Sequence, residues 1–116
     1  MSFLKVETNI PLSEINDSFF IESTDILAKT LNKSPSEISV FVNADQPMIF
    51  GGSQEPAAIV VLQSVGGISP NNNKNHSAAL FPLISKHLKV QENRISIAFN
   101  AVEPHDAGVN GKTFIQ

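Results

Sequence analysis

The chain repeats one strand–helix–strand pattern, and this repeat constrains its fold more than any other feature of the sequence. Segment 31–40 matches segment 88–97 at a constant offset of 57. Each segment starts with a leucine, reaches an isoleucine seven positions later, and continues with a serine and a β-branched residue. Two tandem β-α-β units account for this match, with pseudo-repeats at about 1–44 and 57–100.

In the first half, residues 3–8 alternate apolar and polar side chains, which predicts a strand. Asp17 or Ser18 is expected to cap the following helix, because a side-chain oxygen there can accept a backbone proton. Asn32 is expected to end this helix, and residues 38–42 predict a second strand. The stripe that the helix turns toward the core is Phe19, Ser23, Ile26, Leu27, Thr30 and Leu31.

The second half opens with an almost unbroken apolar run at 57–65, which is typical of a strand covered on both faces. Gly66 and Gly67 end this strand, and a turn with close backbone approach accounts for them. Residues 69–73 offer several N-caps for a second helix, and residues 95–99 predict the last long strand. The stripe of the second helix is Ser77, Leu80, Phe81, Ile84 and Leu88.

These elements predict a single α/β domain over residues 1–116, with a four-stranded mixed sheet and two helices on one face. Each crossover is expected to be right-handed and to give a parallel strand pair. Because two helices cover only one face, the apolar run 57–65 predicts that other subunits bury the second face. Segments 48–50 and 107–114 are expected to cross subunit boundaries and pair with sheet edges. The alternative is a monomer whose sheet has one partly solvated face.

Composition narrows the range of functions. The 8 Lys and Arg residues against 11 Asp and Glu residues give a net charge of −3, which argues against a nucleic-acid partner. The absence of cysteine excludes disulfides, thiolate metal sites and a cysteine nucleophile. No apolar run approaches the roughly 20 residues of a membrane span, and charged or polar residues interrupt segment 1–11. We therefore expect no membrane insertion and no classical leader.

The three histidines do not predict a metal site. His76 and His87 lie on one predicted helix, but at its rise per residue they are about 16 Å apart and cannot share an ion. These two residues and His105 are interpreted as surface or capping groups. No metal and no cofactor are expected.

Five short segments together resemble the macrophage migration inhibitory factor family, which includes D-dopachrome tautomerase. They are 8–11 (TNIP), 45–53 (DQPMIFGGS), 55–56 (EP), 64–66 (SVG) and 110–114 (NGKTF). The resemblance covers almost the whole chain, and its most specific part is FGGS followed by EP. Segment 76–78 (HSA) favours the dopachrome branch, whereas segment 45–53 favours the cytokine branch, so the nearer branch stays open.

The resemblance implies a homotrimer in which three sheets surround a central channel and an active site lies at each subunit interface. Family members catalyse keto–enol tautomerisation of small aromatic substrates such as phenylpyruvate and dopachrome. Animal members are also cytokines that are secreted without a leader and bind cell-surface receptors. The resemblance therefore implies a location in the cytoplasm, outside the cell, or both.

Position 2 is the most consequential departure from the family, whose catalytic base is the amine of an N-terminal proline. This chain has Ser2 there. If Met1 is removed, Ser2 presents a primary amine, whose ordinary pKa of about 7.7–8.0 still allows weak base catalysis. If Met1 stays, the pocket is blocked, and acetylation of Ser2 would abolish its basicity. An engineered start is a third alternative.

The other pocket positions are partly retained and partly altered. The positions that match the family's substrate-binding residues are Lys33, Ser64, Val65 and Phe114. The altered ones are Ser96 in place of a tyrosine, Ala98 in place of an asparagine and Val109 in place of an aromatic residue. The resemblance implies that Lys33 and the Val65 backbone N–H bind the substrate carboxylate. These three substitutions predict a wider pocket with fewer aromatic stacking contacts and fewer hydrogen-bond donors.

Two functions are compatible with this combination of retained and altered pocket residues. The first is a cytokine-type binding protein that acts as a trimer, with tautomerase activity lost or weak. The second is an active tautomerase that uses the Ser2 amine with Lys33. The Cys-x-x-Cys motif of the family's vertebrate cytokine is replaced, because Ala57 and Val60 occupy its positions, so thiol-redox activity is excluded.

Overall fold

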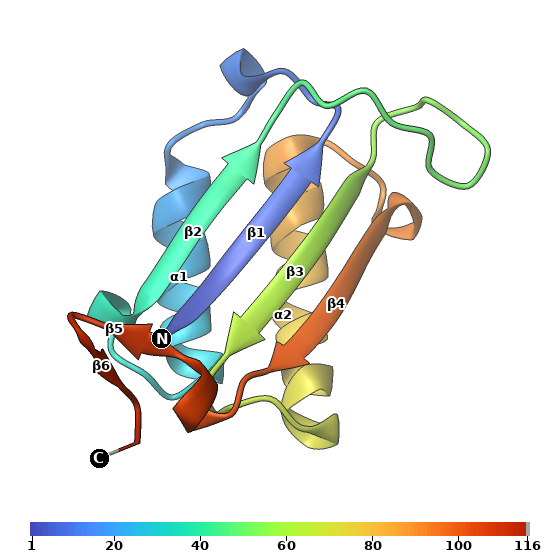
Figure 1. Cartoon of the computed structure of the whole chain (residues 1–116). Helices are drawn as coiled ribbons and strands as arrows, with labels where there is room; N and C mark the ends of the chain where they lie inside the picture. Colours follow the sequence, from blue (N-terminus) through green and yellow to red (C-terminus); the bar gives the residue numbers. More distant parts are fainter. Residues whose placement is uncertain (116) are drawn as a thin grey trace.

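The computed structural model describes residues 1–115 as one four-stranded sheet with two helices packed on one of its faces (Figure 1). The elements are β1 (Ser2–Thr8), α1 (Ser18–Thr30), β2 (Ile38–Asn43), β3 (Ala58–Ser64), α2 (Pro70–Leu88) and β4 (Ile95–Ala101), followed by the short β5 (Gly108–Val109) and β6 (Lys112–Thr113). The strand order is β2-β1-β3-β4. Within each repeat the strands are parallel, whereas the central β1 and β3 are antiparallel. The predicted mixed sheet is therefore confirmed.

The core lies between the sheet and the helices. In β1 every second side chain from Ser2 onward is buried, and β3 has the same alternation. Leu4 lies opposite Leu62 and Val6 lies opposite Val60, and all four side chains are almost fully buried. Their burial against α1 and α2 supplies the hydrophobic stabilisation that holds the two repeats together.

The start of α1 differs from the prediction in its capping hydrogen bond. The Asp17 side chain makes no capping hydrogen bond, and the Ser18 backbone N–H instead donates to the Asn16 side-chain oxygen at 2.9 Å. Asp17 is the N-cap residue as predicted, but its expected side-chain bond is absent, because Asp17 already has helical backbone angles and the Asn16 side chain forms an Asx turn instead. The end of the helix is as predicted: Asn32 has a left-handed φ of 55°, the conformation typical of a helix C-terminus.

The second helix is rotated relative to the predicted stripe. Leu80, Ile84 and Leu88 are buried as predicted, whereas Ser77 and Phe81 are only half-buried. The buried face instead includes Leu83 and His76, so the interpretation of His76 as a surface group was wrong. His76 packs its ring in a stacked arrangement against Phe99 of β4, at 6.1 Å between centroids.

His87 also differs from its prediction. Its side chain is almost buried between the helices, where Nε2 contacts the Glu22 carboxylate and the ring lies 5.7 Å from that of Phe19. His87 therefore joins α2 to α1 and was wrongly assigned to the surface. His105 is exposed beside Asp106, as predicted.

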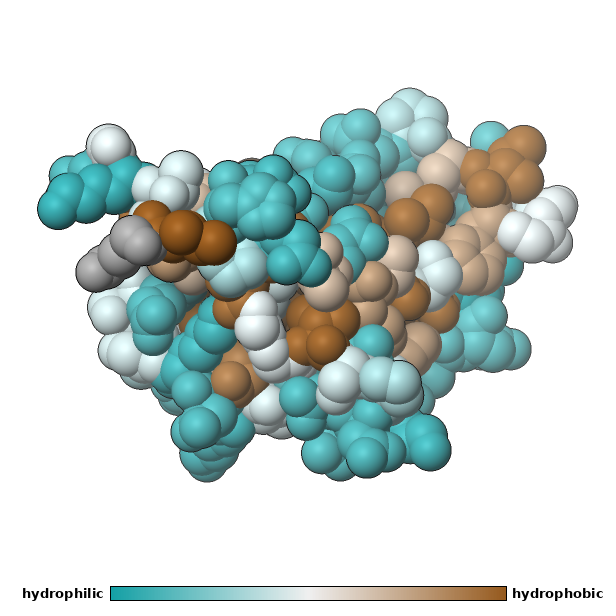
Figure 2. Space-filling model, turned by 60° about the horizontal axis from the view of Figure 1, so that its bottom comes forward, coloured by the Kyte–Doolittle hydropathy of each residue, from teal (hydrophilic) through white to brown (hydrophobic). Residues whose placement is uncertain are grey.

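The face of the sheet away from the helices carries uncovered apolar side chains. Phe41 is 41% exposed, and its ring lies 5.7 Å from the ring of Phe3 on the neighbouring strand. Ile59 of β3 is 42% exposed. Figure 2 shows hydrophobic surface in separate patches between hydrophilic areas on one side of the molecule. Within residues 1–115, none of the helices has the length and apolar character that a membrane crossing requires.

Candidate active site

The start of β1 meets the end of β3 in a small polar cluster. The hydroxyl oxygens of Ser2 and Ser64 are 2.8 Å apart, and both side chains are almost fully buried. The Ser64 hydroxyl donates to the Gly66 carbonyl at 2.6 Å. Since a hydroxyl has a single proton, the Ser2 hydroxyl must donate to Ser64 rather than accept from it. Two residues that the sequence placed in the site are therefore in direct contact.

Lys33 completes this cluster. Its ammonium donates to the Ser64 hydroxyl at 3.0 Å and to the Val65 carbonyl oxygen. The helix end aims the side chain: the Lys33 backbone N–H bonds to the Ala28 carbonyl at 3.0 Å, which closes a Schellman motif around Asn32. Burial lowers the pKa of Lys33, and the neighbouring Glu37 opposes this shift.

Met1 occupies the position in which the resemblance places a substrate carboxylate. The Val65 backbone N–H donates to the Met1 carbonyl at 3.1 Å. Burial, followed by the positive charge of Lys33, lowers the pKa of the Met1 α-amine, while Glu37 raises it. The Met1 α-amine therefore loses its proton more readily than an ordinary α-amine.

A cavity of about 330 Å³ opens at this cluster. Among the residues predicted for the site, Ser2, Val109 and Phe114 line it. The short β5–β6 hairpin brings Phe114 to this cavity. The Phe114 backbone N–H donates to the carbonyls of Pro104 and Ala107, each at 3.1 Å.

Three further residues of the lining were missed by the sequence reasoning: Ser36, Glu37 and Ser39. A signal for Glu37 was present. Ser34 and Glu37 form a capping box in which the Ser34 side chain accepts from the Ser36 amide and the Glu37 carboxylate accepts from the Ser34 amide. The S-x-x-E spacing after Lys33 predicts this turn, which faces the cavity.

Ser96 and Ala98 do not reach this cavity within one chain. Ser2 pairs with Ser64 at one end of β3, whereas Ser96 pairs with Ile59, five positions further along the strand. Five residues of strand span about 17 Å. The structure therefore brings Ser2, Lys33, Ser64, Val65, Val109 and Phe114 to one end of the sheet and leaves Ser96 and Ala98 apart from them.

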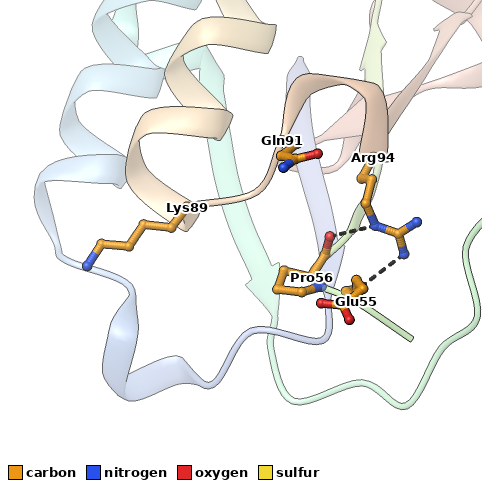
Figure 3. A pocket seen from close by; sticks show the side chains of 5 residues that line it. All are labelled: Glu55, Pro56, Lys89, Gln91 and Arg94. Atoms are coloured by element: carbon orange, nitrogen blue, oxygen red, sulfur yellow. Dashed lines mark hydrogen bonds between the residues drawn. The ribbon is translucent and has the colours of Figure 1, made fainter. Parts of the chain in front are cut away.

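A second cavity, of about 410 Å³, surrounds Arg94 (Figure 3). The Arg94 guanidinium donates to the carbonyls of Phe50, Ser53, Glu55 and Pro56 at 2.9–3.1 Å. It also lies 5.2 Å from the centroid of the Phe50 ring. These contacts tie segment 50–56 to the start of β4. Lys89 also lines this cavity, and in Figure 3 its side chain points away from Arg94.

No group of three or more acidic, histidine or cysteine side chains suited to a metal ion occurs in the described part of the chain, residues 1–115. Hydroxyl groups, one ammonium, one carboxylate and backbone amides therefore make up the chemistry of the candidate site. These groups can bind an anion and can keep a neighbouring amine in its neutral form.

Comparisons with known proteins agree with the fold described above. The family model described as macrophage migration inhibitory factor (MIF) matches residues 1–115. Homologues of this factor from Brugia malayi and Trichinella spiralis are each 38% identical over 114 residues, which is 98% of this chain and 99% and 100% of those proteins. The solved structure of the Trichinella spiralis factor matches with a TM-score of 0.92 and 36% identity, over 96% of this chain and 98% of that one. The factor from Toxoplasma gondii matches with a TM-score of 0.87 and 26% identity, again over 96% and 98%.

Proposed function

Because the chain belongs to the macrophage migration inhibitory factor family, we propose that it is a cytokine-type binding protein of that family. It acts as a homotrimer through surface contacts, with a cell-surface receptor of the family's kind as partner. It functions in the cytoplasm or outside the cell. Its tautomerase activity is weak or lost.

The observation that carries this proposal is the state of the site at the start of β1. Ser2 replaces the ring amine that the resemblance assigns as the base, and the Val65 amide is already bonded to the Met1 carbonyl. The Lys33 ammonium is similarly engaged by Ser64 and the Val65 carbonyl. A site whose Val65 amide is bonded to Met1 and whose ring amine is replaced is poor at proton abstraction.

The trimer is supported by the uncovered side of the sheet. The helices cover one face, and the other presents Phe41 and Ile59 with about two-fifths of each exposed. Ser96 and Ala98 also lie on strand β4 far from Ser2, so their participation in the site requires a second copy of the chain. Burial of this face between subunits explains both features.

A tautomerase that uses the Ser2 amine with Lys33 is the second candidate. The observation that favours it is the lowered pKa of the Met1 α-amine, next to the start of β1, caused by burial and then by Lys33. Removal of Met1 would place the Ser2 amine close to this environment and would free the Val65 amide. A small aromatic keto acid is then the substrate class, with its carboxylate on Lys33 and Val65.

Two measurements decide between these candidates. Intact mass of the naturally expressed protein reveals whether Met1 is removed and whether Ser2 is acetylated. Tautomerisation of phenylpyruvate and of dopachrome methyl ester is then measured for the wild type and for Ser2→Pro. We expect a wild-type rate close to background and a gain of about 10²-fold or more in Ser2→Pro, the typical contribution of a positioned base.

Each other outcome has a definite meaning. Substantial wild-type turnover would overturn the proposal of weak catalysis and favour the second candidate. Inactivity of both proteins would attribute the loss to Ser96, Ala98 and Val109 rather than to position 2.

A further inference from the structure

The loop that follows β3 is held by three side chains from three different parts of the chain. Its carbonyl groups at positions 65, 66 and 67 each accept a hydrogen bond, from Lys33, Ser64 and His76 respectively. We refer to residues 65–68 as the glycine loop. Three consecutive backbone acceptors are thus satisfied by side chains, and not by secondary structure.

This loop has little rigidity of its own. Gly66 and Gly67 both have left-handed φ values, 82° and 81°, and paired glycines leave the backbone many alternative conformations. A Cβ at Gly67 would lie 2.9 Å from the Leu31 side chain, so the loop approaches the end of α1 closely. External contacts must therefore select the conformation that presents the Val65 amide to the candidate site.

His76 is the contact that the candidate chemistry leaves unexplained. It is 0% exposed, and its Nε2 donates to the Gly67 carbonyl at 2.8 Å, since a carbonyl can only accept. Its Nδ1 is buried without a hydrogen-bond partner. A buried nitrogen without a partner destabilises the fold, so a phenylalanine of similar shape would fill this space at lower cost. The presence of an imidazole at position 76 is better explained by its hydrogen bond to the Gly67 carbonyl.

We propose that His76 is a positioning residue that fixes the glycine loop, and thereby aims the Val65 amide at an anionic ligand between the loop and Lys33. His76 acts from the second turn of α2 and touches no ligand itself. The ring stacked on Phe99 sets the orientation of the imidazole, and the Nε2–H bond transmits that orientation to the loop. This inference rests on the proposed role of Val65 and Lys33 in carboxylate binding, and it concerns the chain without Met1, whose carbonyl otherwise takes the Val65 amide.

The test compares His76→Phe with His76→Gln. Phenylalanine retains the ring against Phe99 but has no donor, whereas the glutamine amide nitrogen reaches about as far as Nε2 and donates. Ser77→Ala, at the neighbouring half-buried position, is the matched control. Backbone order parameters from ¹⁵N relaxation report the loop directly, and titration with phenylpyruvate reports the site.

We expect order parameters near 0.85 at Gly66 and Gly67 in the wild type, His76→Gln and Ser77→Ala, and values below about 0.6 in His76→Phe. The dissociation constant for phenylpyruvate should rise about tenfold in His76→Phe alone. Wild-type order parameters in His76→Phe would overturn the proposal. Equal loosening in His76→Gln and His76→Phe would also overturn it, because the donor would then be irrelevant.

The two readouts separate this inference from the proposed site. If the wild type does not bind phenylpyruvate, the carboxylate role of Val65 fails, while the order parameters still decide whether His76 holds the loop. If the loop loosens and the affinity stays unchanged, the link from His76 to the site is overturned. Should His76→Phe not fold, His76→Met provides an unbranched variant without a donor for the same comparison.

Discussion

The Lys33 ammonium lies 3.0 Å from the Ser64 hydroxyl oxygen, a contact between residues 31 positions apart in the sequence. The Schellman motif at the end of α1 directs Lys33 toward the end of β3, where the Ser64 hydroxyl also contacts Ser2. The candidate site thus depends on one helix terminus meeting one strand terminus. Changes at either end should affect ligand binding more than stability.

The first prediction concerns Lys33. Lys33→Met should lower the affinity for phenylpyruvate by about tenfold, because a charge-assisted hydrogen bond to the carboxylate is lost. The free energy of unfolding should change by only about 1 kcal/mol, since the lost hydrogen bonds are partly solvated. Calorimetric titration and urea denaturation measure the two quantities. Lys29→Met is the matched control, because Lys29 is exposed in the last turn of α1, shortly before Lys33. An equal loss of affinity in both variants would contradict a specific role for Lys33.

The second prediction concerns the open face of the sheet. Ile59→Glu should convert the proposed trimer to a monomer at micromolar concentration, because a carboxylate would be buried without a partner at the proposed interface. Sedimentation velocity measures the change. Ile21→Glu is the control: Ile21 is 64% exposed on α1, the helical side of the molecule, and its substitution should leave the mass unchanged. A wild type that sediments as a stable monomer would refute the explanation of the uncovered face.

The third prediction concerns Arg94, whose guanidinium holds four carbonyl groups of segment 50–56. Arg94→Ala should destabilise the fold by about 2 kcal/mol, since several acceptors lose a charged donor. Arg94→Lys should recover less than half of this, because an ammonium lacks the planar fork. Urea denaturation gives the stability, and limited proteolysis should cut segment 50–56 faster in both variants. An unchanged rate of proteolysis in Arg94→Ala would contradict the conclusion that Arg94 holds segment 50–56 in place.

The fourth prediction concerns acid stability. The hydrogen bond from His87 holds the pKa of Glu22 below its ordinary value of 4.5, with a smaller contribution from Lys86. A lowered pKa means that the unfolded chain binds more protons at Glu22 in this range. The stabilising contribution is therefore fully present above pH 4.5 and is lost as the pH falls through the lowered pKa.

The melting temperature of the wild type should accordingly fall more between about pH 5 and about pH 3 than that of Glu22→Gln. Differential scanning calorimetry at several pH values measures this difference. Glu92→Gln removes an exposed carboxylate in the turn before β4 and should leave the wild-type slope unchanged. Parallel curves for the wild type and Glu22→Gln would rule out the Glu22–His87 contact as the source.

Much of the fold follows from patterns that lie within a few residues of one another. The alternation at 3–8 and the recurring leucine-to-isoleucine spacing predicted β1, both helices and the parallel pair in each repeat. The predictions that failed concerned the capping bond at the start of α1 and the buried face of α2. In α2, positions 76 and 83 are buried in place of 77 and 81, while Leu80, Ile84 and Leu88 stay in the buried stripe. Periodicity alone defines the two borders of such a stripe poorly.

The sequence by itself determined the secondary-structure elements, the family and the altered residue at position 2. The tertiary structure alone decided that β1 and β3 run antiparallel, which brings Ser2 and Ser64 together across 62 residues. It likewise decided that the Met1 carbonyl takes the Val65 amide, and that His76 reaches Gly67. These contacts depend on strand register and helix rotation, which are set by how the complete core packs and not by any short segment.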